Sequence, residues 1–298
     1  DMAPKKGWLW TAHWHPNKAR LAAGGTQDTL RIFSTKHHQL LQNYPMKGTI
    51  TQVQWHPTQN KLAIAMQGGT ARTSILNLDS NKRIELDSVN EFGARAIGWN
   101  NNGQRVAVGD YDGMLTIFDD AGKKIKRIAT HQKSIIGLDW HPSKDIIIAV
   151  GDRISIYDLK SDTLFQVEDR KEDVLMLCVE WHPSGDFFVT GDYGDFEHHF
   201  PPLLQFWTTD GEKIKTIEAS KAEFRALKWS EDGALLATAS ENIRLWDSDG
   251  NLVSEKACPD LLWGIDWNQK GNQLVTTDKK GSIVVWNRNL KRWKALKY

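Results

Sequence analysis

Short apolar or alternating stretches, separated by turn residues, run along the whole chain. Seven of these stretches are β-patterned and end in tryptophan, and successive tryptophans are 38 to 48 residues apart. Four of the seven begin the tripeptide Trp-His-Pro. A period of this length indicates one supersecondary unit repeated seven times. The periodic tryptophans are Trp14, Trp55, Trp99, Trp140, Trp181, Trp229 and Trp267.

The pattern within each unit predicts four short strands. The first strand ends at the tryptophan, as in residues 134–140, and a turn such as residues 182–186 follows. The second is nearly all apolar or small, as in residues 106–109, which indicates burial on both faces. The third alternates and usually ends in an aromatic residue, as in residues 154–157. The fourth is more charged, as in residues 213–217, which is typical of an outer edge.

A four-stranded sheet cannot bury both of its faces alone, so these units must stack around an axis and cover one another. Each periodic tryptophan is expected to stabilise the stack by roughly 1.5–3 kcal/mol through burial, and we assign these residues a structural role only. The prediction is an all-β fold, a seven-bladed β-propeller of four-stranded antiparallel blades, in one domain over residues 1–298. The blades are expected at about residues 7–46, 47–90, 91–131, 132–171, 172–219, 220–258 and 259–298.

Residues 131–158 resemble a WD repeat, and a literal Trp-Asp pair ends a third strand at Trp246-Asp247. The resemblance covers about residues 7–298 and implies a WD40-like β-propeller. No repeat has the Gly-His dipeptide of that family intact. The family's buried His–Asp hydrogen-bond network is therefore expected to be partial, with His131 and Asp112 as its candidates.

The last repeat has a segment of its own, residues 291–298, for an outer strand. The first strand begins around Trp8, which leaves few residues before it to complete the last blade. We therefore expect the last blade to be closed by its own C-terminal strand without strand exchange. The alternative is a native N-terminus longer than the one present here.

Composition and charge favour an ordinary globular protein. Hydrophobic residues make up 40% of the chain and charged residues 25%, with a formal net charge of +1. This balance predicts neither nucleic acid nor a membrane as the main partner. No apolar run approaches the ~20 residues of a membrane helix, and no signal peptide is evident, so we expect a cytoplasmic location. Cys178 and Cys258 lack metal-ligand spacing.

Known catalytic motifs are missing: there is no GxSxG, Walker loop, HExxH or CxxC. The histidines of the Trp-His-Pro tripeptides recur at equivalent sites, so we interpret them as turn residues spread around the ring. His198 and His199 lie beside Asp192, Asp195 and Glu197, where a metal site is the less favoured alternative. The sequence therefore predicts no enzyme, no cofactor and no metal.

An insertion at residues 191–202 lengthens the fifth repeat. In propellers that this chain resembles, loops joining the second and third strands lie on the face where the first strands begin and where partners commonly bind. Tyr193, Phe196 and Phe200 make this loop a candidate for aromatic recognition of a partner. The alternative is that the loop folds onto the propeller and shields a blade edge.

The position four residues before each periodic tryptophan is the second candidate site. In the WD-repeat family this position lies at a bulge near the channel mouth. Blades one and seven are neighbours in a closed ring, so Trp10, Trp263 and Arg225 should form one arc, with Arg95 opposite. Trp and Arg are enriched at binding hot spots; the alternative is packing between blades. The seven residues are Trp10, Thr51, Arg95, Ile136, Leu177, Arg225 and Trp263.

The position just before each periodic tryptophan should face the central channel, because side chains alternate along a strand. These residues are mostly polar, which predicts a solvated channel. They are His13, Gln54, Gly98, Asp139, Glu180, Lys228 and Asp266.

The leading functional prediction is a non-catalytic protein-interaction scaffold. It binds a partner protein or peptide, of unknown identity, on the face near the channel mouth. The alternative is a small-ligand or metal-dependent enzyme or binding protein that uses the mouth of the central channel. We expect a monomeric domain, and membership of a larger chain or complex stays open.

Overall fold

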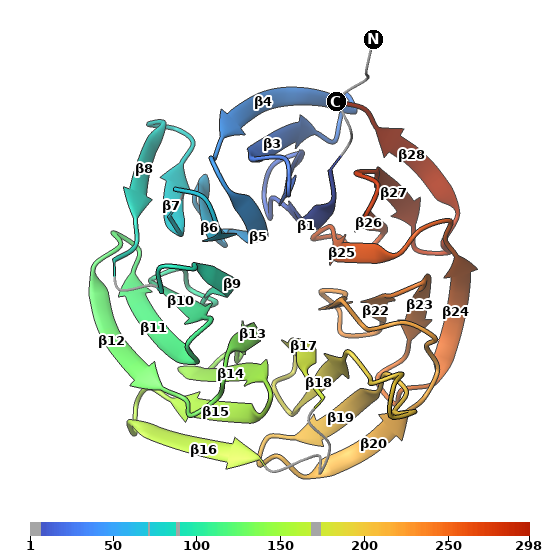
Figure 1. Cartoon of the computed structure of the whole chain (residues 1–298). Coiled ribbons are helices and arrows are strands. Elements are labelled where there is room, and N and C mark those ends of the chain that lie inside the picture. Colours follow the sequence, from blue (N-terminus) through green and yellow to red (C-terminus); the bar gives the residue numbers. More distant parts are fainter. Residues whose placement is uncertain (1–6, 71, 88–89, 168–173) are drawn as a thin grey trace.

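Seven sheets stand around a central axis in the computed structural model, which describes residues 7–70, 72–87, 90–167 and 174–298 (Figure 1). Each sheet has four strands that follow one another in chain order, and the paired strands are antiparallel. The predicted seven-bladed β-propeller is therefore confirmed. The described residues include no helix with the length and apolar character needed to cross a membrane.

The innermost strand of each blade ends at a periodic tryptophan. These seven tryptophans are between 2% and 6% exposed, so their indoles are packed between blades. Burial of that apolar area is the main attraction between neighbouring sheets. The inner strands are β1 (Leu9–Trp14), β5 (Thr49–Trp55), β9 (Ala94–Trp99), β13 (Ile135–Trp140), β17 (Met176–Trp181), β21 (Ala226–Trp229) and β25 (Leu262–Trp267).

The second strands form the most buried layer, because each lies between two strands of its own sheet and between two neighbouring blades. Their apolar and small residues leave almost no exposed surface after the first position. They are β2 (Arg20–Gly25), β6 (Lys61–Gln67), β10 (Arg105–Asp110), β14 (Ile146–Gly151), β18 (Phe187–Asp192), β22 (Leu236–Ala239) and β26 (Gln273–Asp278).

The third strands alternate toward an aromatic or apolar end. In three blades the indole N–H of that end donates to a threonine hydroxyl of the second strand: Trp207 to Thr190, Trp246 to Thr238, and Trp286 to Thr276. The third strands are β3 (Thr29–Ser34), β7 (Ser74–Asn77), β11 (Met114–Asp119), β15 (Ile154–Asp158), β19 (Leu204–Thr208), β23 (Asn242–Trp246) and β27 (Ile283–Asn287).

The outer strands form the circumference of the ring and are its most exposed layer. Lysine and other charged residues along them oppose pairing with other chains at these free edges. The outer strands are β4 (Gln39–Pro45), β8 (Lys82–Glu85), β12 (Lys124–Ala129), β16 (Thr163–Val167), β20 (Lys213–Ile217), β24 (Leu252–Ala257) and β28 (Arg292–Leu296).

The ring closes between the seventh and first blades without strand exchange, as predicted. Strand β28 pairs with β27, so the last blade has its own outer strand. One apolar cluster then joins the two blades, with Leu9, Trp14 and Phe33 on one side and Val285 and Leu296 on the other. Closure therefore depends on side-chain packing, not on a shared sheet.

The predicted buried pair of His131 and Asp112 is wrong. Both residues are exposed, and His131 has a positive φ of 58° in the turn. The buried carboxylate of this turn is Asp110, which accepts from the backbone N–H groups of Asp112 and Met114. In the next blade Gln132 is buried beside His131 and donates to the Ser155 hydroxyl and the Ala149 carbonyl.

Three of the four histidines of the Trp-His-Pro tripeptides lie within hydrogen-bond distance of the next blade: His56, His141 and His182. Nδ1 of His141 accepts from two backbone N–H groups of its own turn, while Nε2 lies 3.1 Å from the carbonyl oxygen of Gly185 in the next blade. Its ring also packs against Trp181 at a centroid distance of 4.7 Å. His56 makes the same contacts with Gly103 and its neighbouring blade.

Glycine is required opposite these histidines. Gly103 has a φ of +72°, and a Cβ there would lie 2.2 Å from the His56 ring. Gly185, with a φ of +78°, would bring a Cβ within 2.6 Å of the His141 ring. Each turn therefore supplies a left-handed residue and the space for a histidine from the preceding blade.

Burial lowers the pKa values of His56 and His141 below the ordinary 6.5, and lowers that of His15 to about 4. Neutral histidine is therefore the stable form in the folded protein. Below pH 6.5 the unfolded chain binds more protons at these histidines than the folded protein does. Their contribution to stability is therefore full above pH 6.5 and is lost as the pH falls below that value.

We predict that His141→Gln lowers stability at pH 7.5 by about 1 kcal/mol, or about 3 °C in Tm, because a bond between blades is lost. The loss of stability between pH 7 and pH 5 should be smaller in the variant than in the wild type, because one depressed titration is removed. Thermal denaturation across this range measures both effects. His37→Gln at an exposed site is the control and should leave the profile unchanged. Parallel pH profiles for wild type and His141→Gln would contradict the interpretation.

Candidate functional site

The mouth of the central channel lies on the face where the inner strands begin, which we call the top face. The seven residues four positions before the periodic tryptophans all line the cavity at this mouth. In six blades the register between the first and second strands shifts at this residue, which marks a β-bulge. In the sixth blade the residue is Arg225, directly before β21. The bulge turns a side chain out of the pleat and toward the mouth.

Four of these side chains form a continuous stack, which we call the mouth stack. The Trp10 and Trp263 rings lie 4.8 Å apart between centroids and are tilted by 31°. The Arg225 guanidinium carbon is 4.0 Å from the Trp263 centroid, and that of Arg95 is 4.6 Å from the Trp10 centroid. All four are half-buried. Two cations thus contact two indoles that belong to the first and seventh blades.

The position predicted for Arg95 is corrected by this contact. Sequence position put Arg95 on the opposite side of the mouth from the Trp10–Trp263 arc. Its guanidinium instead contacts the Trp10 ring, because a long side chain at a bulge extends inward from its blade. The alternative of packing between blades also holds in part, since Trp10 and Trp263 contact each other across the junction that closes the ring.

The insertion at residues 191–202 is anchored to the top face next to the mouth stack. Asp192 is buried and accepts from the backbone N–H groups of Gly194 and Leu203, and Asp195 and Phe200 form an antiparallel bridge. The Tyr193 ring lies 5.7 Å from the Arg225 guanidinium carbon.

The aromatic rings of this insertion are not all buried by its folding. Tyr193 is 45% exposed and Phe196 is 55% exposed, while Phe200 is half-buried. The insertion therefore brings apolar surface to the solvent on the same side of the molecule as Arg225.

Sequence reasoning missed three neighbours of the mouth stack. Trp8 is 46% exposed and its ring lies 5.3 Å from that of Trp263. Glu223 accepts a hydrogen bond of 2.8 Å from Nε of Arg225. Tyr111 raises the pKa of Arg95 against the effect of burial and donates its hydroxyl to Gln67. Trp8 and Glu223 each lie two residues before a stack member, and this spacing was the available signal.

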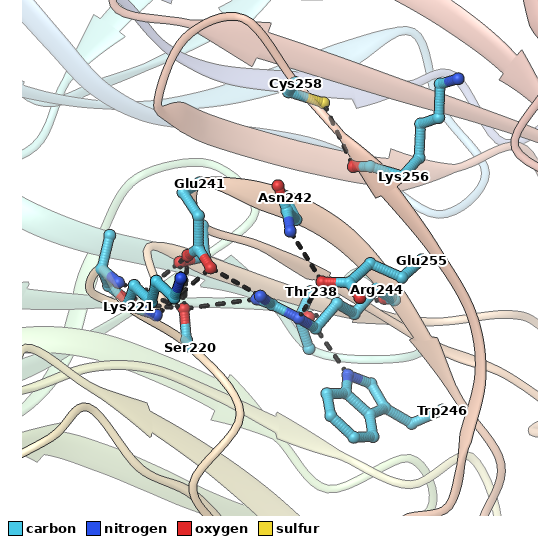
Figure 2. Close-up of polar contacts among 12 residues, drawn as sticks. Ser220, Lys221, Thr238, Glu241, Asn242, Arg244, Trp246, Glu255, Lys256 and Cys258 are labelled. Atoms are coloured by element: carbon cyan, nitrogen blue, oxygen red, sulfur yellow. Dashed lines mark hydrogen bonds and ion pairs between the residues drawn. The ribbon is translucent and has the colours of Figure 1, made fainter.

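A polar network in the sixth blade fixes the loop that carries Glu223 and Arg225 (Figure 2). Arg244 has a side chain only 5% exposed and pairs with Glu241 and Glu255. The Ser220 hydroxyl contacts Glu241, and both Ser220 and Ser240 lie within hydrogen-bond distance of the Ala222 carbonyl. Burial alone would raise the pKa of Glu241, but hydrogen bonds from Arg244 and the serines lower it to about 2.

Below the mouth, the residues just before the periodic tryptophans face the channel as predicted, and all seven line the cavity. Several of them accept a hydrogen bond from a backbone N–H in the inner strand of the next blade. That strand is the edge of its sheet and has no neighbouring strand on its channel side. Asp266 accepts from Trp14 N at 2.7 Å, and Asp139 from Trp181 N at 2.7 Å. Gln54 accepts from Trp99 N. The lining therefore bonds neighbouring blades in addition to contacting solvent.

Charged lining residues form one cluster that spans neighbouring blades. Lys228 pairs with Glu180. Burial alone would lower the pKa of Lys228, but Glu180, Asp139 and Asp266 raise it. Burial raises the pKa of Asp266 to about 7 and also raises that of Glu180, and in both cases Lys228 opposes the rise. The pKa of Asp139 is raised by burial and by the charge of Glu180.

His13 completes the cluster as a neutral residue. Burial, and then the charge of Lys228, lower the pKa of His13 to about 3. Its Nδ1 lies 2.9 Å from the carbonyl oxygen of Trp14. The cluster thus has one cation, Lys228, which attracts several carboxyl groups.

The candidate metal ligands of the insertion do not converge. His198 pairs with Asp195 at 2.6 Å in an exposed turn, while Asp192 is buried and bonds backbone groups. Within the described ranges, no group of three or more His, Cys, Asp or Glu side chains has the arrangement of a metal site. Cys178 is buried and Cys258 is half-buried, and both are free.

Comparisons with known proteins agree with this architecture. A family model described as the WDR19 first beta-propeller matches residues 10–184, which is more than half of the chain. A second model, described as eukaryotic translation initiation factor eIF2A, matches residues 122–265.

Individual relatives are similar at low identity. APC/C activator protein CDH1 of Saccharomyces cerevisiae is 23% identical over 68% of this chain and 36% of its own length. B-type cell cycle switch protein ccs52A of Medicago truncatula is 26% identical over 64% and 41%. SIR4-interacting protein SIF2 of Saccharomyces cerevisiae is 24% identical over 60% and 28%. The matched chain thus spans 28% to 41% of the length of these relatives.

We predict that Lys228→Met destabilises the protein by about 2–4 kcal/mol at pH 8, because buried carboxylates lose their cation. Lys228 keeps 29% of its side-chain exposure, so the cost should lie toward the lower end. The folded-state pKa of Asp266 is raised to about 7, so protonated Asp266 contributes to stability at low pH. This contribution is lost as the pH rises through 7. Lys228→Met should therefore destabilise the protein less at pH 6 than at pH 8.

Urea denaturation at pH 6 and pH 8 measures this difference. Lys18→Met is the matched control, because Lys18 forms an exposed pair with Asp79 and such pairs contribute about 0–1 kcal/mol. Equal destabilisation of Lys228→Met at the two pH values would show that the cluster is not held by this charge.

Proposed function

Because the chain belongs to the WD-repeat β-propeller family, we propose that it is a non-catalytic platform that binds a partner protein or peptide on its top face, at the channel mouth. The observation that carries the proposal is the mouth stack of Trp10, Trp263, Arg95 and Arg225, which lies half-buried around the cavity. Tryptophan and arginine are the side chains most enriched where binding energy is concentrated.

Exposed aromatic rings extend this surface. Trp8, Tyr193 and Phe196 are each between 45% and 55% exposed, and Trp8 and Tyr193 contact members of the stack. A polar rim with aromatic residues at its centre is the usual composition of a protein-binding patch. The insertion at residues 191–202 is part of the proposed surface for this reason.

The cavity supports a protein partner more than a small ligand. Its volume is about 140 Å³, whereas small-molecule sites occupy about 300–1,000 Å³. The deeper carboxyl groups also bond the backbone of neighbouring blades, which uses their acceptor capacity for the fold. No reaction is part of the proposal.

The relatives support the same class of function by their names. CDH1 is described as an activator protein of APC/C, and SIF2 as a protein that interacts with SIR4. We carry over only the general idea of a propeller that acts through partners.

We predict that a partner captured by wild-type protein in a quantitative pull-down is lost from the double variant Arg225→Ala/Trp263→Ala. Removal of two central side chains should weaken binding at least tenfold. A second variant lacking residues 195–201 tests the insertion and should weaken capture of the same partner.

Arg288→Ala is the matched control. Arg288 also lies over an indole, that of Trp267, and pairs with Asp232, but it lies at the opposite end of the channel. Near-UV circular dichroism checks that each variant keeps its fold. Undiminished capture by the folded double variant would rule out the mouth as the binding site.

A further inference from the structure

We propose that the mouth accepts one carboxylate side chain, an Asp or Glu of the partner segment, at the guanidinium of Arg95. Apolar partner side chains should flank this acid and contact the surrounding indole and phenyl rings. This inference rests on the proposed function and specifies the chemistry of the partner at the same surface.

Arg95 has hydrogen-bond donors to offer at the mouth. Its guanidinium carbon lies 4.6 Å from the Trp10 centroid, and this cation–π contact supplies no hydrogen-bond acceptor for its N–H groups. Among the described residues, no carboxylate forms an ion pair with Arg95, and the Tyr111 hydroxyl is the neutral group that raises its pKa against the effect of burial. Since the Tyr111 hydroxyl donates its hydrogen to Gln67, it can offer only its oxygen to Arg95. A single neutral acceptor leaves most of the five guanidinium donors for a ligand.

The two arginines of the mouth stack differ in their charged partners. Arg225 already has a carboxylate, since Glu223 accepts from it at 2.8 Å. Among the residues that the structure describes, Arg95 is the guanidinium of the mouth stack that has no carboxylate paired with it. Burial lowers the pKa of Arg95, and the nearby charge of Arg225 acts in the same direction. A single bound carboxylate compensates this charge and matches the fork of the guanidinium. A phosphate dianion carries more negative charge than this one guanidinium compensates.

Apolar surface lies beside this charge. Trp8 and Tyr193 are exposed and contact members of the stack, and Phe196 is exposed in the same insertion as Tyr193. Phe92 is 66% exposed and lies three residues before Arg95. A free small carboxylate would leave these rings in water, whereas an acidic residue within a peptide would bring side chains to cover them. The surface thus fits an acid with apolar neighbours.

The experiment begins with a randomised twelve-residue peptide library displayed on phage and selected on the wild-type protein. The expected consensus has one Asp or Glu flanked by apolar or aromatic residues. The selected peptide is then synthesised in three forms, with Glu, Gln or phosphoserine at the acidic position. Calorimetry measures the affinity of each form for wild type, Arg95→Gln and Arg95→Lys.

Wild type should bind the Glu peptide about 10- to 100-fold more tightly than the Gln peptide, which is the usual effect of a charge-assisted hydrogen bond. Arg95→Gln should bind the two equally, and Arg95→Lys should show an intermediate preference because it keeps the charge without the fork. Phosphoserine should bind no better than Glu. Arg288→Gln, with its indole contact at the other end of the channel, should behave as wild type.

Four outcomes overturn the inference. Peptides that bind the mouth without an acidic preference, or a Glu preference that persists in Arg95→Gln, remove the carboxylate site but leave the platform proposal standing. Tighter binding of phosphoserine than of Glu would show that the site prefers a dianion to a single carboxylate. A selection that yields no peptide dependent on the mouth would also reject the carboxylate site, and if pull-downs are unaffected by Arg225→Ala/Trp263→Ala it would reject both proposals.

Discussion

The structure depends on the fact that each four-stranded sheet has two apolar faces and covers neither by itself. Every blade must therefore pack between two others, and the ring must close for the first and last blades to be covered at all. In this chain the closing junction has no shared strand, since β28 completes the seventh blade. It is held by the apolar cluster that joins Leu9 and Phe33 to Val285 and Leu296, and by the bond from Trp14 N to Asp266. Histidines in the Trp-His-Pro turns and acceptors in the channel repeat such contacts between other blades.

The same junction carries the candidate site, so closure and binding are physically linked. Trp10 and Trp263 contact each other across it, and each contacts the guanidinium of an arginine. The contact is possible because bulges in β1 and β25 turn both side chains out of the pleat at the same level of the channel. A rigid ring thus holds large aromatic and cationic side chains in place before any partner arrives, which reduces the entropy lost on binding. In the sixth blade, the ion pair of Arg244 with Glu241 and the hydrogen bond from Ser240 to the Ala222 carbonyl hold the loop before Arg225 in place.

The architecture could be predicted from the sequence because a period of about forty residues, marked by tryptophan, has few physical solutions. The place of Trp10, Trp263 and Arg225 at the mouth followed from their common offset to that marker together with the resemblance to the WD-repeat family. What failed was decided by single residues in contact. Two aspartates in one turn satisfy the same pattern, and only the fold shows that Asp110 is the buried one. Likewise Gln132, next to His131, makes the buried contacts. The reach of Arg95 to Trp10 and the charge cluster around Lys228 involve side chains from different blades, and no local pattern encodes them.

The most direct test of this account is an experimental structure of the chain in complex with a partner segment selected by its binding. We expect the segment to cross the top face over Trp10 and Trp263, with a carboxylate against Arg95 and side chains against the insertion at residues 191–202. A segment bound along the outer strands, or over the Trp-His-Pro turns at the other end of the channel, with the mouth stack uncovered, would contradict it.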